Sequence, residues 1–359
     1  DVYFDLEGDP YVGVDGGIEY LWGWSTADGY ECIWAHDTEQ ERAALETFVD
    51  RVEARRAEFP DLRVYHYAPH EASTLRGLSV RYGTREAEID NWLRGGVLVD
   101  LYAVVRQGLQ VGEERYSLKT LESHHGFTRT ELTVKEGGGS IIAYERWLET
   151  GDHAFLDAIR EYNREDCEST ASLHRWLYDR MRPEAEDEFQ IRFAELEPPP
   201  VDATEPPKWL PAVEELIARL VDGLPESPGE DSVDQAERRL LAQLLLYHYR
   251  ESKPEWWEWF DLKAKSPTEL VDEPDAVGML TLDSGVDPVP VKRSQDWVMR
   301  FPEQEVRLKP GSVVDPTASK KATNRLVRLG EGILVLRRAS GAPTAPALIP
   351  SGPIDGAPL

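Results

Sequence analysis

The stretch DVYFDLEGDP (residues 1–10) decides how the first part of the chain folds. Hydrophobic and polar residues alternate through it, and a period of two is typical of a strand with one buried face. Asp5 and Glu7 are two residues apart, so both carboxylates project from the same side of such a strand. Because like charges repel, the pair predicts a nearby cation, base or water. A solvated strand surface is the alternative interpretation of an isolated Asp-x-Glu pair.

The residues that follow predict a mixed sheet with helices. Short β-branched or aromatic runs between glycine-containing turns predict strands over 1–7, 18–25, 30–35, 62–67 and the start of 96–105. Apolar spacing, with a capping box at Thr38 and Glu41, predicts helices over 38–58, 70–83, 116–126, 141–149 and 153–180. Three sequential strands followed by alternating helices and strands indicate an α/β fold, in which parallel strands extend an antiparallel meander.

Changes in composition predict five segments. These are an α/β domain, a Pro-rich linker, a helical segment, a small β-rich domain and a disordered tail, over 1–182, 183–211, 212–275, 276–338 and 339–359. The aromatic run EWWEWF (residues 255–260) favours packing between the helical and β segments, with stacking on bases as the alternative. KEGGGS (residues 135–140) lacks the Gly-Lys-Ser/Thr of a phosphate-binding loop, so we expect a flexible turn there and no ATPase activity.

Charge and cysteine content narrow the functional class. The formal net charge of −27 argues against non-specific binding of polyanions by the whole surface. Residues 301–340 reverse the trend, with eight basic and four acidic side chains, which predicts a contact with phosphate. With two cysteines and no run of about 18 apolar residues, the sequence predicts a cytoplasmic protein without a membrane span. The chain opens in a strand without an initiator Met, so we expect a piece of a longer protein.

Two later segments supply acids that we expect near Asp5 and Glu7. In RVYHYAPHEAS (residues 63–73), Glu71 opens a helix directly after a predicted strand. In AIREYNREDCESTASLHRWL (residues 158–177), Tyr162 and Asp166 are four residues apart and share one helix face.

Taken in order, these motifs resemble those of DEDD-superfamily 3′–5′ exonucleases of the tyrosine type. The closer similarity is to the RNase-H-like domain of proteins described as predicted RecB-like nucleases, in which a superfamily 1 helicase often follows. This similarity covers about residues 1–180, and the sequence motifs that carry it are FDLEGDP, VYHYAPHE, SLKTLE, YERWL and YNREDC. LLLYHYRESKPEWWEWFDL (residues 244–262) looks like the segment that leads into the helicase part. The resemblance implies a ribonuclease-H-like mixed sheet with flanking helices.

The resemblance also implies a two-metal-ion phosphodiesterase with a role in DNA repair. Two Mg²⁺ or Mn²⁺ ions generate the nucleophilic hydroxide and relieve charge on the leaving oxygen. By resemblance, Asp5 bridges both ions, and Glu7 and Asp166 hold the ion that activates water. Glu71 takes an outer position at the second ion, and Tyr162 orients the attacking water.

The second motif departs from the family pattern. The family has an Asn, then an aromatic residue directly followed by Asp. This sequence has Tyr67 at the Asn position, His70 at the aromatic position and Glu71 at the Asp position. This departure supports an alternative function, a non-catalytic nucleic-acid-binding or scaffolding module of a helicase assembly. A structure-specific ribonuclease H or endonuclease is a further alternative. A Lys or Arg that replaced the cations in the pocket would argue against a nuclease.

Basic residues predict where a nucleic acid strand lies. Lys119, Lys320, Lys321 and Arg325 are the candidates for contacts with phosphate, although Lys119 is equally consistent with the flank of an amphipathic helix. Single-stranded DNA is the expected substrate, in preference to RNA. Asp100, at the end of a predicted strand, is interpreted as a hydrogen-bonded structural residue.

Overall fold

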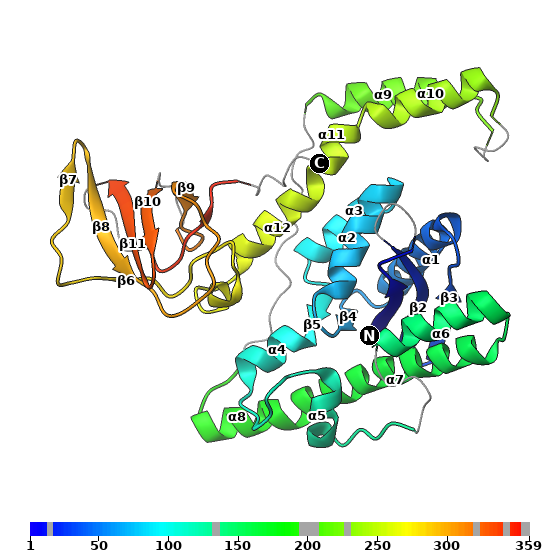
Figure 1. Cartoon of the computed structure of the whole chain (residues 1–359), viewed down its shortest axis with the longest axis horizontal. Coiled ribbons are helices and arrows are strands. Elements are labelled where there is room, and N and C mark those ends of the chain that lie inside the picture. Colours follow the sequence, from blue (N-terminus) through cyan, green and yellow to red (C-terminus); the bar gives the residue numbers. More distant parts are fainter. Residues whose placement is uncertain are drawn as a thin grey trace. The chain divides into compact units, whose positions relative to one another are not determined.

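Strand β1 (Val2–Asp9) lies in the middle of a five-stranded sheet with the order β3–β2–β1–β4–β5 (Figure 1). β2 (Ile18–Thr26) and β3 (Gly29–Trp34) form the antiparallel meander. β4 (Val64–His66) and β5 (Leu98–Asp100) are the parallel additions. The predicted mixed sheet with flanking helices, consistent with a ribonuclease-H-like fold, is confirmed.

The structure is a computed structural model that describes residues 1–12, 17–130, 137–193, 208–225, 231–318, 324–339 and 345–352. It divides into two units, Asp1–Lys208 and Trp209–Leu359, and each is described by itself. The helices of the first unit are α1 (Thr38–Glu58), α2 (His70–Tyr82), α3 (Glu86–Arg94), α4 (Leu101–Gly108), α5 (Leu118–His125), α6 (Gly137–Thr150), α7 (Ala154–Trp176), the π-helical turn η1 (Leu177–Met181) and α8 (Arg182–Phe189). Helix α3 is absent from the sequence-based prediction.

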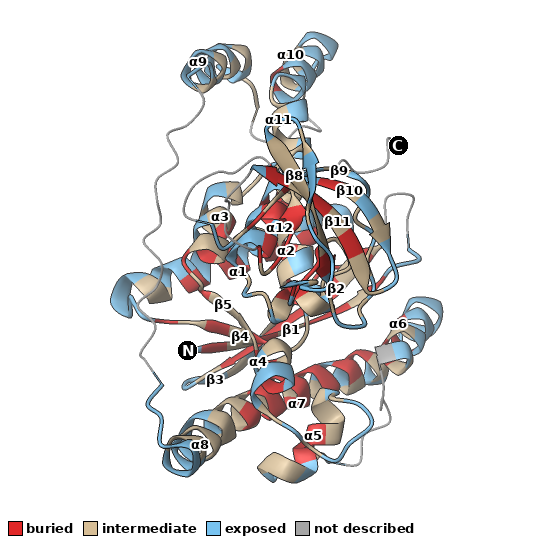
Figure 2. Cartoon of the chain, turned by 90° about the vertical axis from the view of Figure 1, so that its left-hand side faces the viewer, coloured by how far each residue is buried: buried red, intermediate tan, exposed pale blue. Residues whose placement is uncertain are grey.

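Helices cover both faces of the first sheet. Val2, Phe4 and Leu6 of β1 pack with apolar side chains of α1, α2 and α3. On the opposite face, Tyr20 and Leu21 of β2 pack against α6 and α7, and Figure 2 shows a buried stripe along α7. Since successive side chains of a strand point to opposite faces, the polar residues of β1 lie on the α7 side.

The start of α1 differs from the predicted capping box. Asp37, not Thr38, caps the helix, and its side chain accepts a hydrogen bond of 2.8 Å from the Gln40 backbone N–H. Glu41 turns into the interior, where it accepts a hydrogen bond of 2.6 Å from the backbone N–H of Glu19. Buried backbone donors compete for this carboxylate, so the local capping pattern does not decide its orientation.

The second unit contains helices followed by an antiparallel sheet. Its helices are α9 (Leu210–Val221), α10 (Val233–Leu244), α11 (Tyr247–Glu251), α12 (Lys253–Ala264) and the 3₁₀ turn η3 (Glu269–Asp272). Its strands are β6 (Thr281–Leu282), β7 (Val289–Val291), β8 (Ser294–Arg300), β9 (Gly311–Val314), β10 (Asn324–Gly330), β11 (Ile333–Ala339) and β12 (Ile349–Pro350). The sheet order is β12–β9–β10–β11–β8–β6, and β7 pairs with β8. Within the described ranges, no helix is both long and apolar enough to cross a membrane.

Two sequence-based predictions need correction. The range 183–211, expected as a linker, is helical where α8 and α9 enter it. Residues 345–352, expected in a disordered tail, include β12, and Ile349 is buried against Trp259 and Leu262. The indole N–H of Trp259 donates to the Pro350 carbonyl at 2.8 Å, so this tryptophan packs against the β segment. The prolines of this tail indicated disorder, but the short apolar run among them, which includes Ala347 and Ile349, packs in the core of the second unit.

Candidate active site

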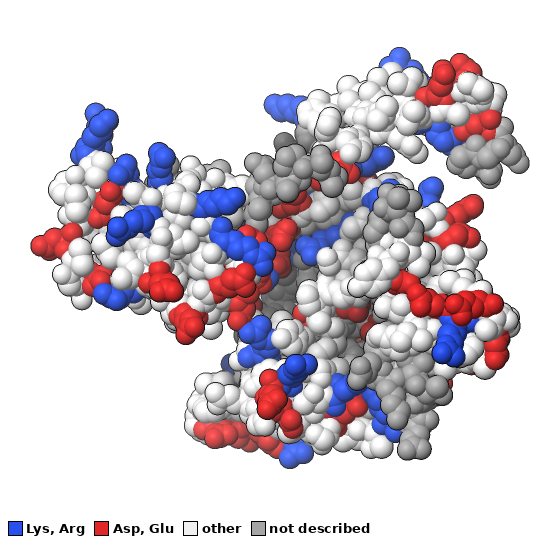
Figure 3. All heavy atoms as spheres, in the orientation of Figure 1, with Lys and Arg blue, Asp and Glu red and all other residues white. Residues whose placement is uncertain are grey.

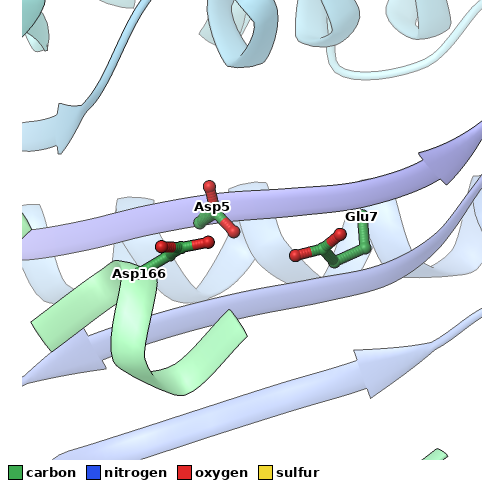
Figure 4. A group of neighbouring side chains, drawn as sticks. All are labelled: Asp5, Glu7 and Asp166. Carbon is green, nitrogen blue, oxygen red and sulfur yellow. The ribbon is translucent and has the colours of Figure 1, made fainter. Parts of the chain in front are cut away.

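Three carboxylates meet between β1 and α7. Oxygen atoms of Asp5, Glu7 and Asp166 all lie within 4.8 Å of one another, and Figure 4 shows the first two on β1 beside the third on α7. Among the described residues, this is the one group of at least three acidic, His or Cys side chains so close together. The structure therefore brings together three of the four acids that the sequence selects.

Negative charge accumulates in this cluster without full compensation. Burial, followed by the charges of Asp166 and Glu7, raises the pKa of Asp5 well above its ordinary value. Burial and the charge of Asp166 raise the pKa of Glu7 to about 8. The pKa of Asp166 is also raised, because burial outweighs the contact with Arg129. Buried carboxylates that repel one another favour either protons or a bound cation.

Neutral side chains hold the carboxylates in place. Asn163 donates a hydrogen bond to Asp5 Oδ2 at 2.7 Å, and Ser140 donates to Glu7 Oε2 at 2.6 Å. Gly23 leaves room for Asn163, because a Cβ at this position would lie 1.6 Å from Asn163 Oδ1. Our sequence interpretation missed all three residues. Asn163 precedes Asp166 by about one helical turn, and this spacing could have predicted that both side chains face the site. Ser140 lies in the first turn of α6, where we expected a flexible turn.

Tyr162 lies beside the cluster with its hydroxyl engaged. Lys119 donates a hydrogen bond to this hydroxyl at 2.8 Å, and its ammonium lies 4.6 Å from the ring centroid. Burial and the charges of Asp166, Glu7 and Asp5 strongly raise the pKa of Tyr162. The phenol therefore stays protonated at neutral pH and acts as a hydrogen-bond donor rather than as a base.

A basic side chain reaches the cluster but does not replace a cation. Arg129 donates hydrogen bonds to Asp166 and, at 2.6 Å, to Glu122. Its charge is thus shared between two acids on the edge of the cluster. At Asp5, burial and three acidic neighbours outweigh Arg129, and the pKa remains raised. The cluster therefore has room for protons or cations in addition to Arg129.

Glu71 lies outside the group of three. It is buried at the start of α2, and its Oε2 lies 3.5 Å from His66 Nδ1 without forming a hydrogen bond to any described residue. Burial lowers the pKa of His66, but contact with Glu71 and the charge of Asp100 outweigh this effect and raise it. The charge of Glu71 contributes to the raised pKa of Asp5. Glu71 is therefore an electrostatic neighbour of the cluster.

The remaining candidate residues occupy different surroundings. Lys119 contacts Tyr162 as described above, whereas Arg325 is exposed on β10 in the second unit. Figure 3 shows basic and acidic side chains interspersed on the visible face of this unit. Lys320 and Lys321 lie outside the described residues. Asp100 accepts hydrogen bonds of 2.8 Å from the backbone N–H groups of Ala68 and Tyr102, which is a structural role.

The raised pKa values predict how stability depends on pH. The pKa of Glu7 is raised from an ordinary 4.5 to about 8 in the folded chain. At pH values between these two, the Glu7 carboxyl therefore binds more protons in the folded than in the unfolded chain. The free energy of unfolding of the metal-free protein should therefore fall as pH rises from about 5 to 8. Thermal melts in EDTA at several pH values measure this slope.

Two further measurements make this prediction specific to the cluster. Mn²⁺ at about pH 8 should raise the melting temperature again, because the ion neutralises the ionised carboxylates. Glu7→Gln should flatten the pH dependence, because the amide does not titrate. Melting temperatures that rise with pH over this window, in the absence of metal, would contradict the assignment of raised pKa values.

Comparison with known proteins agrees with this fold and site. Residues 2–178 match the model of a family described as the RNase_H superfamily. A search of curated proteins finds no match. The matched range contains β1 to β5 and all three clustered acids, so the match indicates a nuclease domain with a candidate metal site. Residues 2–178, just under half of the chain, are thus similar to the RNase_H superfamily.

Proposed function

We propose that the first unit is a metal-dependent 3′–5′ exonuclease that hydrolyses phosphodiester bonds at single-stranded DNA ends. The observation that carries the proposal is the convergence of the Asp5, Glu7 and Asp166 oxygens within 4.8 Å. Buried acids that repel one another destabilise the folded protein unless they bind protons or cations, and a divalent cation can neutralise several of them at once. The resemblance to tyrosine-type exonucleases supports the direction of cleavage and the preference for ends.

The donor set fits Mg²⁺ or Mn²⁺. Both are hard cations that prefer carboxylate oxygens, and Mg²⁺ is commonly held by one or two carboxylates together with water. Asp5, Glu7 and Asp166 would hold the ions, and Asn163 and Ser140 orient two of these carboxylates. Bound divalent ions would supply the attacking hydroxide and stabilise charge on the leaving oxygen.

Other residues of the site would orient the attacking water and neutralise the charge of the phosphate. The protonated hydroxyl of Tyr162 is suited to orient the water that attacks phosphorus. Lys119 fixes this hydroxyl and places positive charge where a phosphate would lie. Glu71 Oε2 lacks a hydrogen bond and faces His66 Nδ1 at 3.5 Å, so it would serve at an outer position of a second ion by turning from His66. In the metal-free protein, the pairing with His66 restrains the side chain.

Cleavage assays with labelled oligonucleotides test the proposal. Single-stranded DNA labelled at the 5′ end should shorten progressively from its 3′ end in Mn²⁺ or Mg²⁺, and EDTA should stop the reaction. A circular single strand should resist cleavage, and a strand with a blocked 3′ end should be degraded slowly. Cleavage of the circle, or of RNA–DNA hybrids in preference, would instead favour the endonuclease or ribonuclease H alternatives.

The position of Glu71 outside the cluster favours a second candidate, a non-catalytic module that binds nucleic acid within a helicase assembly. Calorimetric titration with Mn²⁺ separates the two functions, because a catalytic site should take up ions and a degenerate one should not. Binding that is lost in Asp5→Asn would support catalysis. A helicase partner, a role in DNA repair and a cytoplasmic location remain predictions from the sequence.

A further inference from the structure

Arg129 is held at the edge of the acidic cluster by the fold itself. Its Nε donates to Glu122 Oε1 at 2.8 Å, and its Nη2 donates to both Glu122 and Asp166. The next residue, Thr130, donates through its backbone N–H and its hydroxyl to Glu165 of α7, at 2.7 and 2.6 Å. The backbone beside Arg129 is thus fastened to the helix that carries Asp166.

The hydrogen bonds of this guanidinium are unevenly distributed. Two donors converge on Glu122 Oε1, which also accepts from the Ser169 hydroxyl at 3.0 Å. Arg129 Nη1 is buried and has no hydrogen-bond partner among the described residues. A buried donor without a partner is unfavourable, so this arrangement is suited to a change of partner when the site is filled.

A divalent ion and Arg129 require the same carboxylate. Asp166 Oδ1 accepts the hydrogen bond from Arg129, and Asp166 is one of the three acids of the cluster. Repulsion between the cation and the guanidinium opposes simultaneous binding at short range. Glu122 offers the guanidinium a second anionic acceptor outside the group of three.

We propose that Arg129 is a built-in counter-ion that competes with the divalent cation for Asp166, and that Glu122 retains Arg129 when the cation binds. This inference rests on the proposed function and concerns the cation affinity of the same site. Arg129 neutralises Asp166 in the metal-free protein, which limits the repulsion among the buried acids. By the same contact it weakens cation binding. Arg129 acts through Asp166 rather than on the substrate, and is in this sense a positioning residue.

Mn²⁺ titration calorimetry on the full chain tests the proposal through two variants with opposite expected effects. Arg129→Met removes the competitor, and the dissociation constant for Mn²⁺ should fall about tenfold. Glu122→Gln removes the alternative acceptor and one negative charge, and the dissociation constant should rise about tenfold. Damage to the fold would weaken binding in both variants, so the opposite signs identify competition.

Arg164→Met is the matched control. Arg164 lies on α7 two residues before Asp166, and it pairs with Glu161 and Glu168 rather than with the cluster. The change removes the same charge as Arg129→Met does, but from a position on α7 whose ion pairs do not include the cluster, and the Mn²⁺ affinity should stay within about twofold of that of the parent chain.

The outcomes separate this inference from the proposed function. A parent chain that binds no Mn²⁺, or whose binding survives Asp5→Asn, would overturn both. Asp5-dependent binding that Arg129→Met leaves unchanged or weakens, in a variant that melts like the parent, would overturn the inference alone. If Arg129→Met does not fold, Glu122→Gln decides, because unchanged or tighter binding in that variant contradicts competition.

Discussion

Asp166→Asn should lower metal-dependent cleavage by at least about 1,000-fold, because removal of residues that only orient metal ligands already reduces activity about 10- to 100-fold. The amide keeps the size of the side chain, and its oxygen still accepts a hydrogen bond from Arg129. What it loses is the negative charge that Asp166 contributes to the cluster beside Asp5 and Glu7. Single-turnover rates on labelled single-stranded DNA, measured across a Mn²⁺ titration, give the effect.

Stability should move in the opposite direction from activity. Burial raises the pKa of Asp166, so its ionised form is unfavourable in the metal-free fold, and Asp166→Asn should melt at the same or a higher temperature near neutral pH. Loss of activity together with retained stability excludes misfolding as the cause. A cleavage rate within about tenfold of that of the parent chain would remove Asp166 from the proposed site.

Glu168→Gln is the matched control for this substitution. Glu168 lies two residues along α7, where it is partly exposed and pairs with Arg164 rather than with the cluster. The change removes the same charge from the same helix. Because exposed ion pairs contribute little, both cleavage and melting temperature should stay close to those of the parent chain.

Local periodicity explains how much of the site could be read from the sequence. The alternation in β1 places Asp5 and Glu7 on one face whatever the rest of the fold, because strand geometry fixes it. The four-residue spacing of Tyr162 and Asp166 likewise depends on one helix only. That the strand and the helix meet was inferred from resemblance, and the structure shows the contact.

Residues whose contacts depend on distant parts of the chain escaped prediction. Ser140 reaches Glu7 only because α6 packs across the first sheet, and nothing in GGGS marks a buried hydroxyl. Arg129 follows a short helix in an irregular segment, where no period indicates the direction of a side chain. Glu71 was selected by resemblance for an outer position at the second ion, and it lies beside the group of three acids rather than in it.

Gly23→Ala should disrupt both the fold and the site. Gly23 pairs with Asp5 across β2 and β1, and an added Cβ would lie 1.6 Å from Asn163 Oδ1 and 2.7 Å from the Tyr30 hydroxyl. Asn163 must then move, although it donates to Asp5 at 2.7 Å and accepts from Tyr30 at 2.7 Å. Overpacking of this kind costs about 1–3 kcal/mol of stability. Denaturant unfolding of the metal-free protein measures it.

The accompanying loss of activity should be about 10- to 100-fold, because Asn163 orients Asp5. Asn163→Ser in the Gly23→Ala background separates the two effects. The shorter side chain relieves the clash, so stability should partly recover, while the hydrogen bond to Asp5 stays lost and cleavage stays slow. Recovery of both properties would show that only the clash mattered, and that Asn163 does not position Asp5.

Gly77→Ala provides the matched control for the added methyl group. Gly77 lies within α2, where a Cβ would meet nothing within 4 Å. Because alanine is a better helix former, this variant should be more stable by about 0.5–1 kcal/mol, with an unchanged cleavage rate. If Gly23→Ala behaved in the same way, α7 would not pack closely against β2 at this point. The position of Asn163 beside Asp5 would then be wrong.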